Sequence, residues 1–228
     1  LWTLADIKGL IDEGAAKSNP PIDAELTNRI KSVVASVRHS RNVIGYYLEE
    51  DCGGRGVGAA YLKKIYDILK TEDPYRIVML TESPDPAQLA ACDVLHQRQW
   101  VNVIQGEDGS RRFGAPVDRI GEGLIRAFGT PGKALWCGPQ AFAYAEESGD
   151  ARRRILNPME QRFIMLDCLL RGARGFTCHT LWDYTDNLAT RESINSAFNE
   201  LAWLDQFWLH TGNRVAASNN NPKIRVEA

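Results

Sequence analysis

Short apolar segments alternate with helix-like segments along most of this chain, and this alternation restricts its fold more than any other feature. The apolar runs predict strands, because a strand buried on both faces reads as an unbroken apolar run. The expected strands cover 43–48, 76–81, 93–97, 133–137 and 175–180. The expected helices cover 22–39, 57–70, 86–91, 116–128, 158–171 and 190–210. Such alternation predicts an α/β protein with a parallel sheet and outer helices.

The spacing of these units matches a (β/α)8 barrel of the TIM type, which usually has about 250 residues. The expected strands fall short of eight, so we expect an incomplete barrel, its C-terminal portion, over residues 1–212. Residues 213–228 are expected to be a tail leading to a following β element, because 222–226 resemble a strand. Two alternatives stay open: further strands hidden in the first 20 residues or in 100–104, and a doubly wound open sheet. No GxGxxG follows a strand, so the nucleotide-binding form of that sheet has no support.

Charge and composition argue against several kinds of partner. The 228 residues carry 27 Lys and Arg against 29 Asp and Glu, a formal net charge of −2, without a basic stripe or polybasic tail. Neither nucleic acid nor membrane is expected as a partner, and no apolar run approaches the roughly 18 residues of a membrane span. The chain begins at Leu1 without an initiator Met, which suggests a processed piece. A secreted or periplasmic location is therefore open, with the targeting signal absent from this chain.

The five cysteines give no sign of a metal site or of a disulfide framework. They are widely spaced, odd in number, and form no CxxC or Cys/His cluster. Cys92, Cys137 and Cys178 lie in or beside expected strands, where a free thiol usually behaves as a small buried hydrophobe. We therefore expect no metal and no cofactor.

One apolar strand runs directly into three consecutive carboxylates, Glu49, Glu50 and Asp51. In parallel α/β folds, functional groups gather where such strands end. Crowded like charges raise carboxyl pKa values, which is what a general acid near neutral pH needs. Adjacent strand residues point to opposite faces, so at most two of the three acids can face one cavity. A solvated acidic loop is the alternative.

Side chains suited to sugars follow the other expected strands. Aromatic rings stack on the apolar faces of pyranose rings, while Asp, Gln, Arg and His bind hydroxyls. The candidate substrate-binding residues are Glu82, His96, Gln97, Trp136, Gln140, His179, Trp182, Asp183 and Tyr184. Glu82 could instead cap a helix, and His96 or His179 could be packed and hydrogen-bonded. Glycoside cleavage needs one protonated carboxyl and a second carboxylate across the bond.

Three segments resemble the (β/α)8-barrel glycoside hydrolases. Gly45–Asp51 is similar to their fourth strand, an apolar strand that ends in an acidic pair. Ala134–Phe142 resembles their seventh strand, and Gly172–Gly175 resembles the passage from a helix into the eighth. The resemblance covers about residues 22–210. It implies acid/base cleavage of a glycosidic bond in a polysaccharide or oligosaccharide.

The resemblance places the family's general acid on Glu50, with Asp51 nearly equivalent because the order of the acidic pair is reversed here. Many retaining relatives have a nucleophilic Glu at the tip of the seventh strand, where this chain has Gln140. Three outcomes follow: an inverting enzyme with a second carboxylate such as Glu82 or Asp183, a substrate-assisted enzyme, or a protein that binds sugar without cutting it.

Two functions of other classes stay open. The first is a non-catalytic carbohydrate-binding or structural barrel subunit, which Gln140 favours. The second is a metal-dependent barrel isomerase or hydrolase, although no short ligand motif joins the acids and histidines. Its ligands would come from Glu50, Glu82, His96, His179 and Asp183. The expected partners are a carbohydrate substrate and either the missing N-terminal part of the barrel or another subunit.

Overall fold

A computed structural model describes most of the predicted elements. It covers residues 3–11, 19–82, 85–99, 103–105, 111–113, 132–141, 156–177 and 188–208. The chain forms two compact units. The first contains residues 1–97 and 130–135, and the second contains 98–129 and 136–228. The expected helix 116–128 and the expected tail 213–228 lie outside the described residues.

Four parallel strands form the sheet of the first unit. In spatial order they are β1 (Thr3–Asp6), β2 (Val43–Glu50), β3 (Ile77–Thr81) and β4 (Val94–Gln99). Every neighbouring pair is parallel, so the carboxyl ends of the four strands meet at one edge of the sheet. β1 is absent from the expected strands, although the sequence left room for one in the first 20 residues. It is short and has no residue buried within it, which explains its weak sequence signal.

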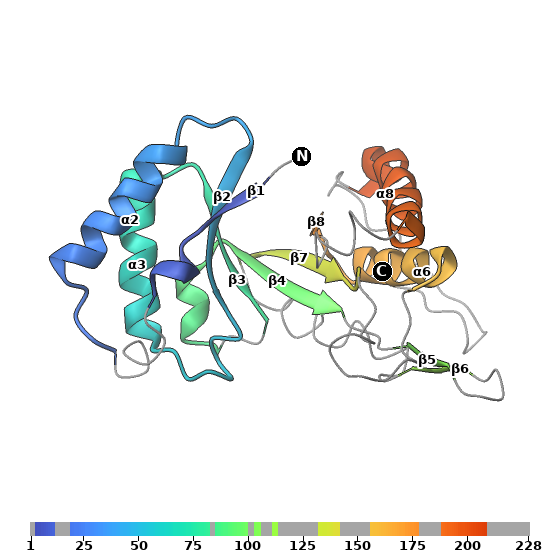
Figure 1. The fold of residues 1–228 in the computed structure, drawn as a ribbon, viewed down its shortest axis with the longest axis horizontal. Coiled ribbons are helices and arrows are strands. Elements are labelled where there is room, and N and C mark those ends of the chain that lie inside the picture. The colour runs from blue at the N-terminus through green and yellow to red at the C-terminus, as the bar shows by residue number, and fades with distance from the viewer. Residues whose placement is uncertain are drawn as a thin grey trace. The chain divides into compact units, whose positions relative to one another are not determined.

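Two amphipathic helices, α2 (Ala24–Val37) and α3 (Ala59–Glu72), lie on one face of these strands (Figure 1). The α2 helix begins where the carboxylate of Asp23 accepts a 2.7 Å hydrogen bond from the amide of Leu26, satisfying one free donor of the first turn. The amide of Tyr61, near the start of α3, donates to the side chain of Asn19. Both helices match the predicted ranges to within a few residues.

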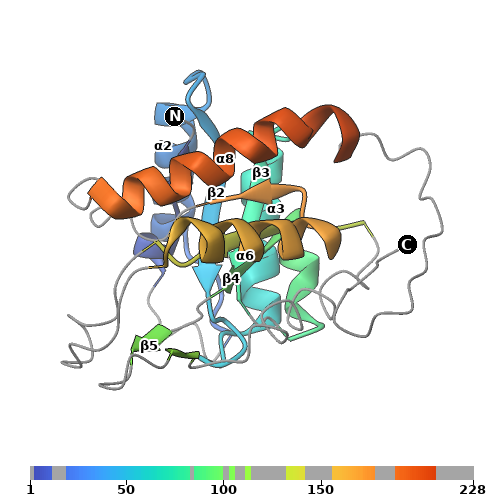
Figure 2. The ribbon, with the colours of Figure 1, turned by 90° about the vertical axis from the view of Figure 1, so that its right-hand side faces the viewer.

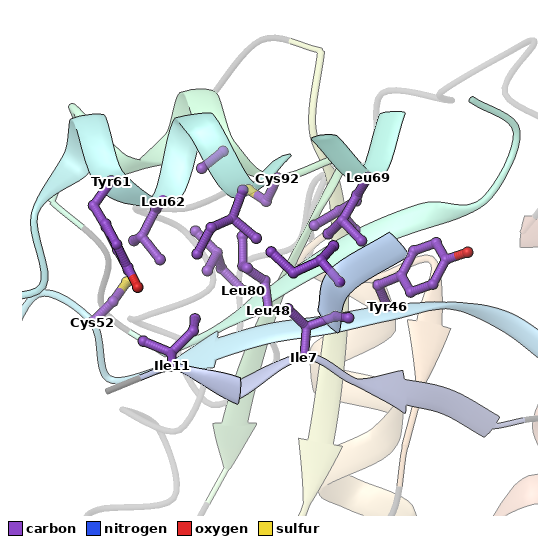
Figure 3. Packing of buried hydrophobic residues seen from close by; sticks show 14 of the residues in the cluster. Ile7, Ile11, Tyr46, Leu48, Cys52, Tyr61, Leu62, Leu69, Leu80 and Cys92 are labelled. Atoms are coloured by element: carbon purple, nitrogen blue, oxygen red, sulfur yellow. The ribbon is translucent and has the colours of Figure 1, made fainter. Parts of the chain in front are cut away.

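The core of the first unit lies between these helices and the strands, as Figure 3 shows. Side chains on alternating strand positions enter it, including Tyr46 and Leu48 from β2. Fully burying each Leu or Ile of this kind contributes about 1.5–3 kcal/mol relative to leaving it exposed. The largest completely buried members are Ile7, Ile30, Tyr46, Leu48, Leu62, Ile65, Leu69 and Leu80.

Two short 3-10 helices complete the first unit: η1 (Lys8–Leu10) after β1, and η2 (Gln88–Ala91) before β4. The short helix expected over 86–91 is present as the 3-10 helix η2, which begins two residues later. Four residues are too few for a ladder of i to i−4 hydrogen bonds, so the segment forms the tighter turn instead.

The amino-terminal edge of this sheet is held by a buried ion pair. Arg76 donates to the carboxylate of Asp73 at 2.7 Å and to the carbonyls of Val43 and Ser40 at 2.8 and 2.7 Å. The hydroxyl of Tyr46 donates to the same carboxylate at 2.9 Å. Burial alone would raise the pKa of Asp73, but the hydrogen bonds from Arg76 and Tyr46 outweigh it and lower that pKa.

A second network on this edge surrounds Asp93. Its carboxylate accepts from the hydroxyl of Tyr66 at 2.8 Å, from Lys70 at 3.2 Å and from the amide of Val78 at 2.9 Å. Burial and the bond to Asp93 raise the pKa of Tyr66 to about 12. Helix α3 and strand β3 are thus tied together through side chains that use both oxygens of one carboxylate.

The second unit contains the parallel strands β7 (Ala134–Pro139) and β8 (Gly175–Phe176) and the helices α6 (Pro158–Leu170) and α8 (Leu188–Trp208). β7 begins in the first unit and continues into the second. Gly175 lies opposite Trp136, where a Cβ would come within 2.6 Å of the indole ring.

Helices α6 and α8 pack side by side in the second unit (Figure 2). Asn157 and Glu160 form a reciprocal capping box at the start of α6, which satisfies two backbone donors. Between the helices, Met165 contacts Ala197 and Leu201 in a small apolar cluster. These contacts, made by residues far apart in the sequence, stabilise the pair.

A short antiparallel hairpin, β5 (Val103–Gln105) and β6 (Arg111–Phe113), also belongs to the second unit. No strand was expected at 111–113. Local pairing with β5 makes these residues a strand, which their polar composition did not indicate.

The prediction of an α/β fold with parallel strands and flanking helices is confirmed. Closure into a barrel stays a prediction. Among the described residues, no helix is long and apolar enough to cross a membrane.

Candidate functional site

Polar and charged side chains collect at the carboxyl ends of the four strands of the first unit. Asp6 ends β1, Glu49 and Glu50 end β2, and Thr81 ends β3. His96 and Gln97 lie near the end of β4. The structure therefore brings the predicted residues to one edge of the sheet, because the strands are parallel; these residues are Glu49, Glu50, Asp51, Glu82, His96 and Gln97.

Glu49 is completely buried, which is unusual for a carboxyl group. Its Oε1 atom accepts hydrogen bonds from the amide of Glu50 at 2.9 Å and from Arg55 Nη1 at 3.3 Å. Its Oε2 atom is buried and has no hydrogen-bond partner among the described residues. A β-bulge between Tyr47 and Glu49 shifts the register of β2 against β3, and it sets where this side chain points.

Burial raises the pKa of Glu49 above its ordinary value of 4.5. The amide of Glu50 and the charge of Lys8 oppose this shift, while the carboxylates of Glu50 and Asp6 add to it. The net result is a carboxyl group that holds its proton to higher pH than an exposed Glu does.

Glu50 has a different environment, although it is the next residue. Its side chain keeps 31% of its surface exposed. The hydroxyl of Tyr47 donates to Oε2 at 2.7 Å, and Lys8 Nζ lies 3.5 Å from Oε1. A neighbouring cation and a hydrogen-bond donor both favour the charged form of a carboxylate. The two adjacent acids therefore differ in solvent access, while each has one cation beside it, Arg55 at Glu49 and Lys8 at Glu50.

Asp51 and Glu82, which follow β2 and β3, both adopt left-handed backbone conformations, with φ of 45° and 64°. Their amides donate to strand carbonyls: Asp51 to Thr81 at 2.9 Å, and Glu82 to His96 at 2.7 Å. The carboxylate of Asp51 lies over Gly54, where a Cβ would meet it at 2.7 Å. Left-handed non-glycine residues are strained, and such strain clusters at functional sites.

His96 and Thr81 form a buried pair at the same edge. Thr81 Oγ1 lies 3.3 Å from His96 Nδ1, and the two residues are 2% and 5% exposed. Gln97 is half-buried. His96 thus has the packed, hydrogen-bonded environment that the sequence left open as an alternative to a binding role.

The glycine-rich loop after Asp51 is fastened by hydrogen bonds. The side-chain amide of Gln88 donates to the carbonyls of Cys52 and Val57, and the Cys52 thiol donates to Gln88 Oε1 at 3.3 Å. Burial raises the pKa of that thiol to about 12, so it stays protonated. This arrangement positions Arg55 against Glu49.

Sequence reasoning missed Lys8, Tyr47 and Arg55, which contact the two acids directly. Lys8 follows a strand that the sequence did not reveal. Arg55 lies between glycines in a loop, and that sequence pattern does not indicate which residue the arginine contacts. Tyr47 was assigned only to the strand, although its position three residues before Glu50 was visible.

The other predicted binding residues belong to the second unit. Trp136 is half-buried opposite Gly175, and Gln140 is 1% exposed. The remaining four, His179, Trp182, Asp183 and Tyr184, lie outside the described residues.

In the part of the chain that the structure describes, no group of three or more His, Cys, Asp or Glu side chains is arranged to hold a metal ion.

The fold and this edge define an α/β protein with a carboxylate pair at the carboxyl ends of parallel strands. No family model matches the chain, and no curated protein matches it significantly. The site itself therefore supplies the argument for function.

Proposed function

We propose that the chain is a glycosidase-type protein that acts on a polysaccharide or oligosaccharide at the carboxyl edge of β1 to β4. One observation carries the proposal: strand β2 ends at this edge in two acids of different accessibility, a completely buried Glu49 whose pKa is raised and a partly exposed Glu50. Acid/base cleavage of a glycosidic bond needs one protonated carboxyl and one carboxylate.

In this proposal, Glu49 is the proton donor. Its Oε1 already accepts two hydrogen bonds, so the proton belongs on Oε2, the atom without a partner among the described residues. From Oε2 the proton can be transferred to the glycosidic oxygen of a bound sugar. Because Oε2 is buried, a substrate reaches it only if the side chains that cover it move aside.

Glu50 is the carboxylate that faces the developing positive charge on the sugar ring or activates a water molecule. Because adjacent strand residues point to opposite faces, it acts together with Glu49 only on a bond that lies across the end of β2. The partial exposure of Glu50 gives a substrate access, and Lys8 and Tyr47 orient its two oxygens. The family resemblance instead gives the acid role to Glu50 or Asp51. The buried environment of Glu49 supports giving the acid role to Glu49 instead. Substitution of each acid separates these assignments.

The test is release of reducing ends from a panel of soluble polysaccharides and oligosaccharides. Compared with the wild type, Glu49→Gln and Glu50→Gln should each lower the rate about 10²–10⁴-fold, the contribution of a general acid or base. Sugar-induced thermal stabilisation should persist in both variants, because the amide keeps the shape of the side chain. Glu25→Gln on the exposed face of α2 is the matched control and should leave the rate unchanged.

Full turnover by either variant at the edge would discard its assigned role. If Asp51→Asn alone abolishes turnover, the acid is Asp51 rather than Glu49. Stabilisation of the wild type by a sugar, without any release of reducing ends, would select the non-catalytic binding function that Gln140 favours.

A further inference from the structure

Two cysteines of the second unit lie in direct contact. Cys137 is in β7 and Cys168 is in α6, and their Sγ atoms are 2.9 Å apart. Both residues are free thiols with no exposed surface. The contact joins two elements separated by 31 positions in the sequence.

This distance is short for two atoms that are not bonded. Non-bonded heavy atoms are best separated by about 3.5–4.0 Å. A disulfide has a sulfur–sulfur bond of about 2.05 Å, so an approach of roughly 0.9 Å would close it. The backbones of β7 and α6 thus already hold the two sulfurs nearly at bonding distance.

The two other described cysteines have oxygen partners. The thiol of Cys52 donates to Gln88 Oε1 at 3.3 Å, and that of Cys92 contacts the carbonyl of Leu89 at 3.6 Å. The fifth, Cys178, lies outside the described residues. Among the cysteines that the structure describes, Cys137 and Cys168 are therefore the pair placed to react with each other.

We propose that Cys137 and Cys168 form a disulfide bond when the chain folds in the presence of a small-molecule disulfide such as oxidised glutathione. One protein thiolate attacks the small disulfide and releases one thiol, leaving a mixed disulfide on the protein. The second protein thiolate then attacks the protein sulfur of that mixed disulfide and releases the second thiol. Two protein thiols are oxidised, one small disulfide is reduced to two thiols, and the two protons are taken up by those products.

Burial determines when this exchange takes place. Both sulfurs are inaccessible in the folded unit, and burial raises the pKa of Cys137 well above its ordinary value. Thiolate exchange is therefore slow once α6 has packed on β7, and the bond forms while the unit is still folding. The product is a structural bond fixing β7, the strand that carries Trp136 and that Gln140 directly follows, to helix α6.

The test is a peptide map of the wild-type chain. The reduced, unfolded chain is refolded in a mixture of oxidised and reduced glutathione, its remaining thiols are blocked with N-ethylmaleimide, and it is digested with trypsin. Cleavage after Lys133, Arg152, Arg162 and Arg171 gives peptides 134–152 and 163–171, which carry Cys137 and Cys168. We expect the two peptides as one linked species that separates on reduction.

Recovery of both peptides blocked by N-ethylmaleimide, or linked to other cysteines, would overturn the proposal. Cys92→Ser is the matched control, because it removes a buried thiol and should leave the linked species unchanged. Cys168→Ser should leave Cys137 blocked or bound to glutathione. Reduction should lower the melting temperature of the oxidised wild type by about 5–10 °C, and an unchanged value would contradict a structural bond. The wild-type map decides even if a variant fails to fold.

Discussion

The two edges of the sheet in the first unit use the same kinds of side chain in opposite ways. At the amino-terminal edge, Asp73 accepts hydrogen bonds from Arg76 and Tyr46, and Arg76 also binds backbone carbonyls. At the carboxyl-terminal edge, Glu49 is buried still more completely, yet one of its oxygens has no partner among the described residues. The Asp73 carboxylate is paired with a guanidinium and a hydroxyl, whereas one oxygen of Glu49 has no partner among the described residues.

The backbone conformation also distinguishes the two edges, because strained residues lie at the carboxyl-terminal edge. The non-glycine residues Asp51 and Glu82, both left-handed, follow the carboxyl ends of neighbouring strands. Strained backbone and unsatisfied polar groups both reduce stability, so a sequence retains them where they serve another purpose. In parallel α/β folds the carboxyl ends of the strands carry function, while the opposite ends carry stability. The contrast within this sheet agrees with that division.

The largest expected effect lies at the amino-terminal edge. Asp73→Ala should lower the free energy of unfolding by about 3 kcal/mol, because it leaves the Arg76 guanidinium largely buried without its carboxylate. Urea unfolding measures the change. The activity proposed for the carboxyl edge should be unaffected under native conditions, because the substitution lies at the opposite edge from Glu49.

Asp67→Ala is the matched control on the same helix. Asp67 pairs with Lys63 four residues earlier, but both side chains are largely exposed, so its loss should cost less than about 1 kcal/mol. Equal losses for the two variants would mean that the network of Asp73 contributes no more than a surface ion pair. The contrast between the edges would then fail.

The next effect is at the carboxyl-terminal edge and has the opposite sign. Glu49→Gln should raise the free energy of unfolding by about 1–2 kcal/mol at neutral pH. The amide keeps an Oε1 acceptor for Arg55 and for the amide of Glu50, and it replaces a carboxyl group that burial disfavours as an ion. Chemical unfolding at several pH values measures it. Such a gain in stability with a loss of turnover is typical of a site built for function.

The pH dependence gives this prediction its sign. Glu49 has a folded-state pKa above 4.5, the ordinary value that applies to the unfolded chain. Between pH 4.5 and the folded-state pKa, the folded chain holds a proton that the unfolded chain has lost. Stability therefore falls as pH rises from 4.5 through the raised pKa, and Glu49→Gln should remove this loss. Asp73 behaves oppositely: its lowered pKa gives stability above 3.8 that disappears as pH falls through the folded value. A pH-independent difference between Glu49→Gln and the wild type would contradict the raised pKa.

Part of this contrast was visible in the sequence. The continuous apolar run of β2 and the helical spacing of α2 and α3 reflect burial against a common core, so the parallel α/β arrangement could be predicted. Three acids directly after β2 also located the carboxyl-terminal edge. Both signals are local patterns of hydrophobicity and charge.

The remaining features depend on contacts between distant residues. Arg76 was assigned only to a strand, and nothing near it in the sequence indicates that it binds carbonyls 33 and 36 residues away. The partial exposure of Glu50 and the burial of Glu49 follow from the bulge in β2, which an unbroken apolar run does not reveal. Left-handed conformations at Asp51 and Glu82 were also hidden, because neither residue is a glycine.

The smallest effect tests the backbone strain at the carboxyl-terminal edge. Glu82→Gly should raise the free energy of unfolding by about 0.5–1 kcal/mol, because glycine adopts a φ of 64° without the steric cost of a Cβ. Gly56→Ala is the matched reverse change: at a φ of 68°, with no atom within 4 Å of the new Cβ, it should cost about 1 kcal/mol through backbone conformation alone. Urea unfolding of both variants measures the pair. If Glu82→Gly destabilises the chain as much as Gly56→Ala does, the contacts of the Glu82 side chain stabilise the fold by more than its left-handed backbone destabilises it. Glu82 would then be a stabilising residue, like Asp73 at the amino-terminal edge.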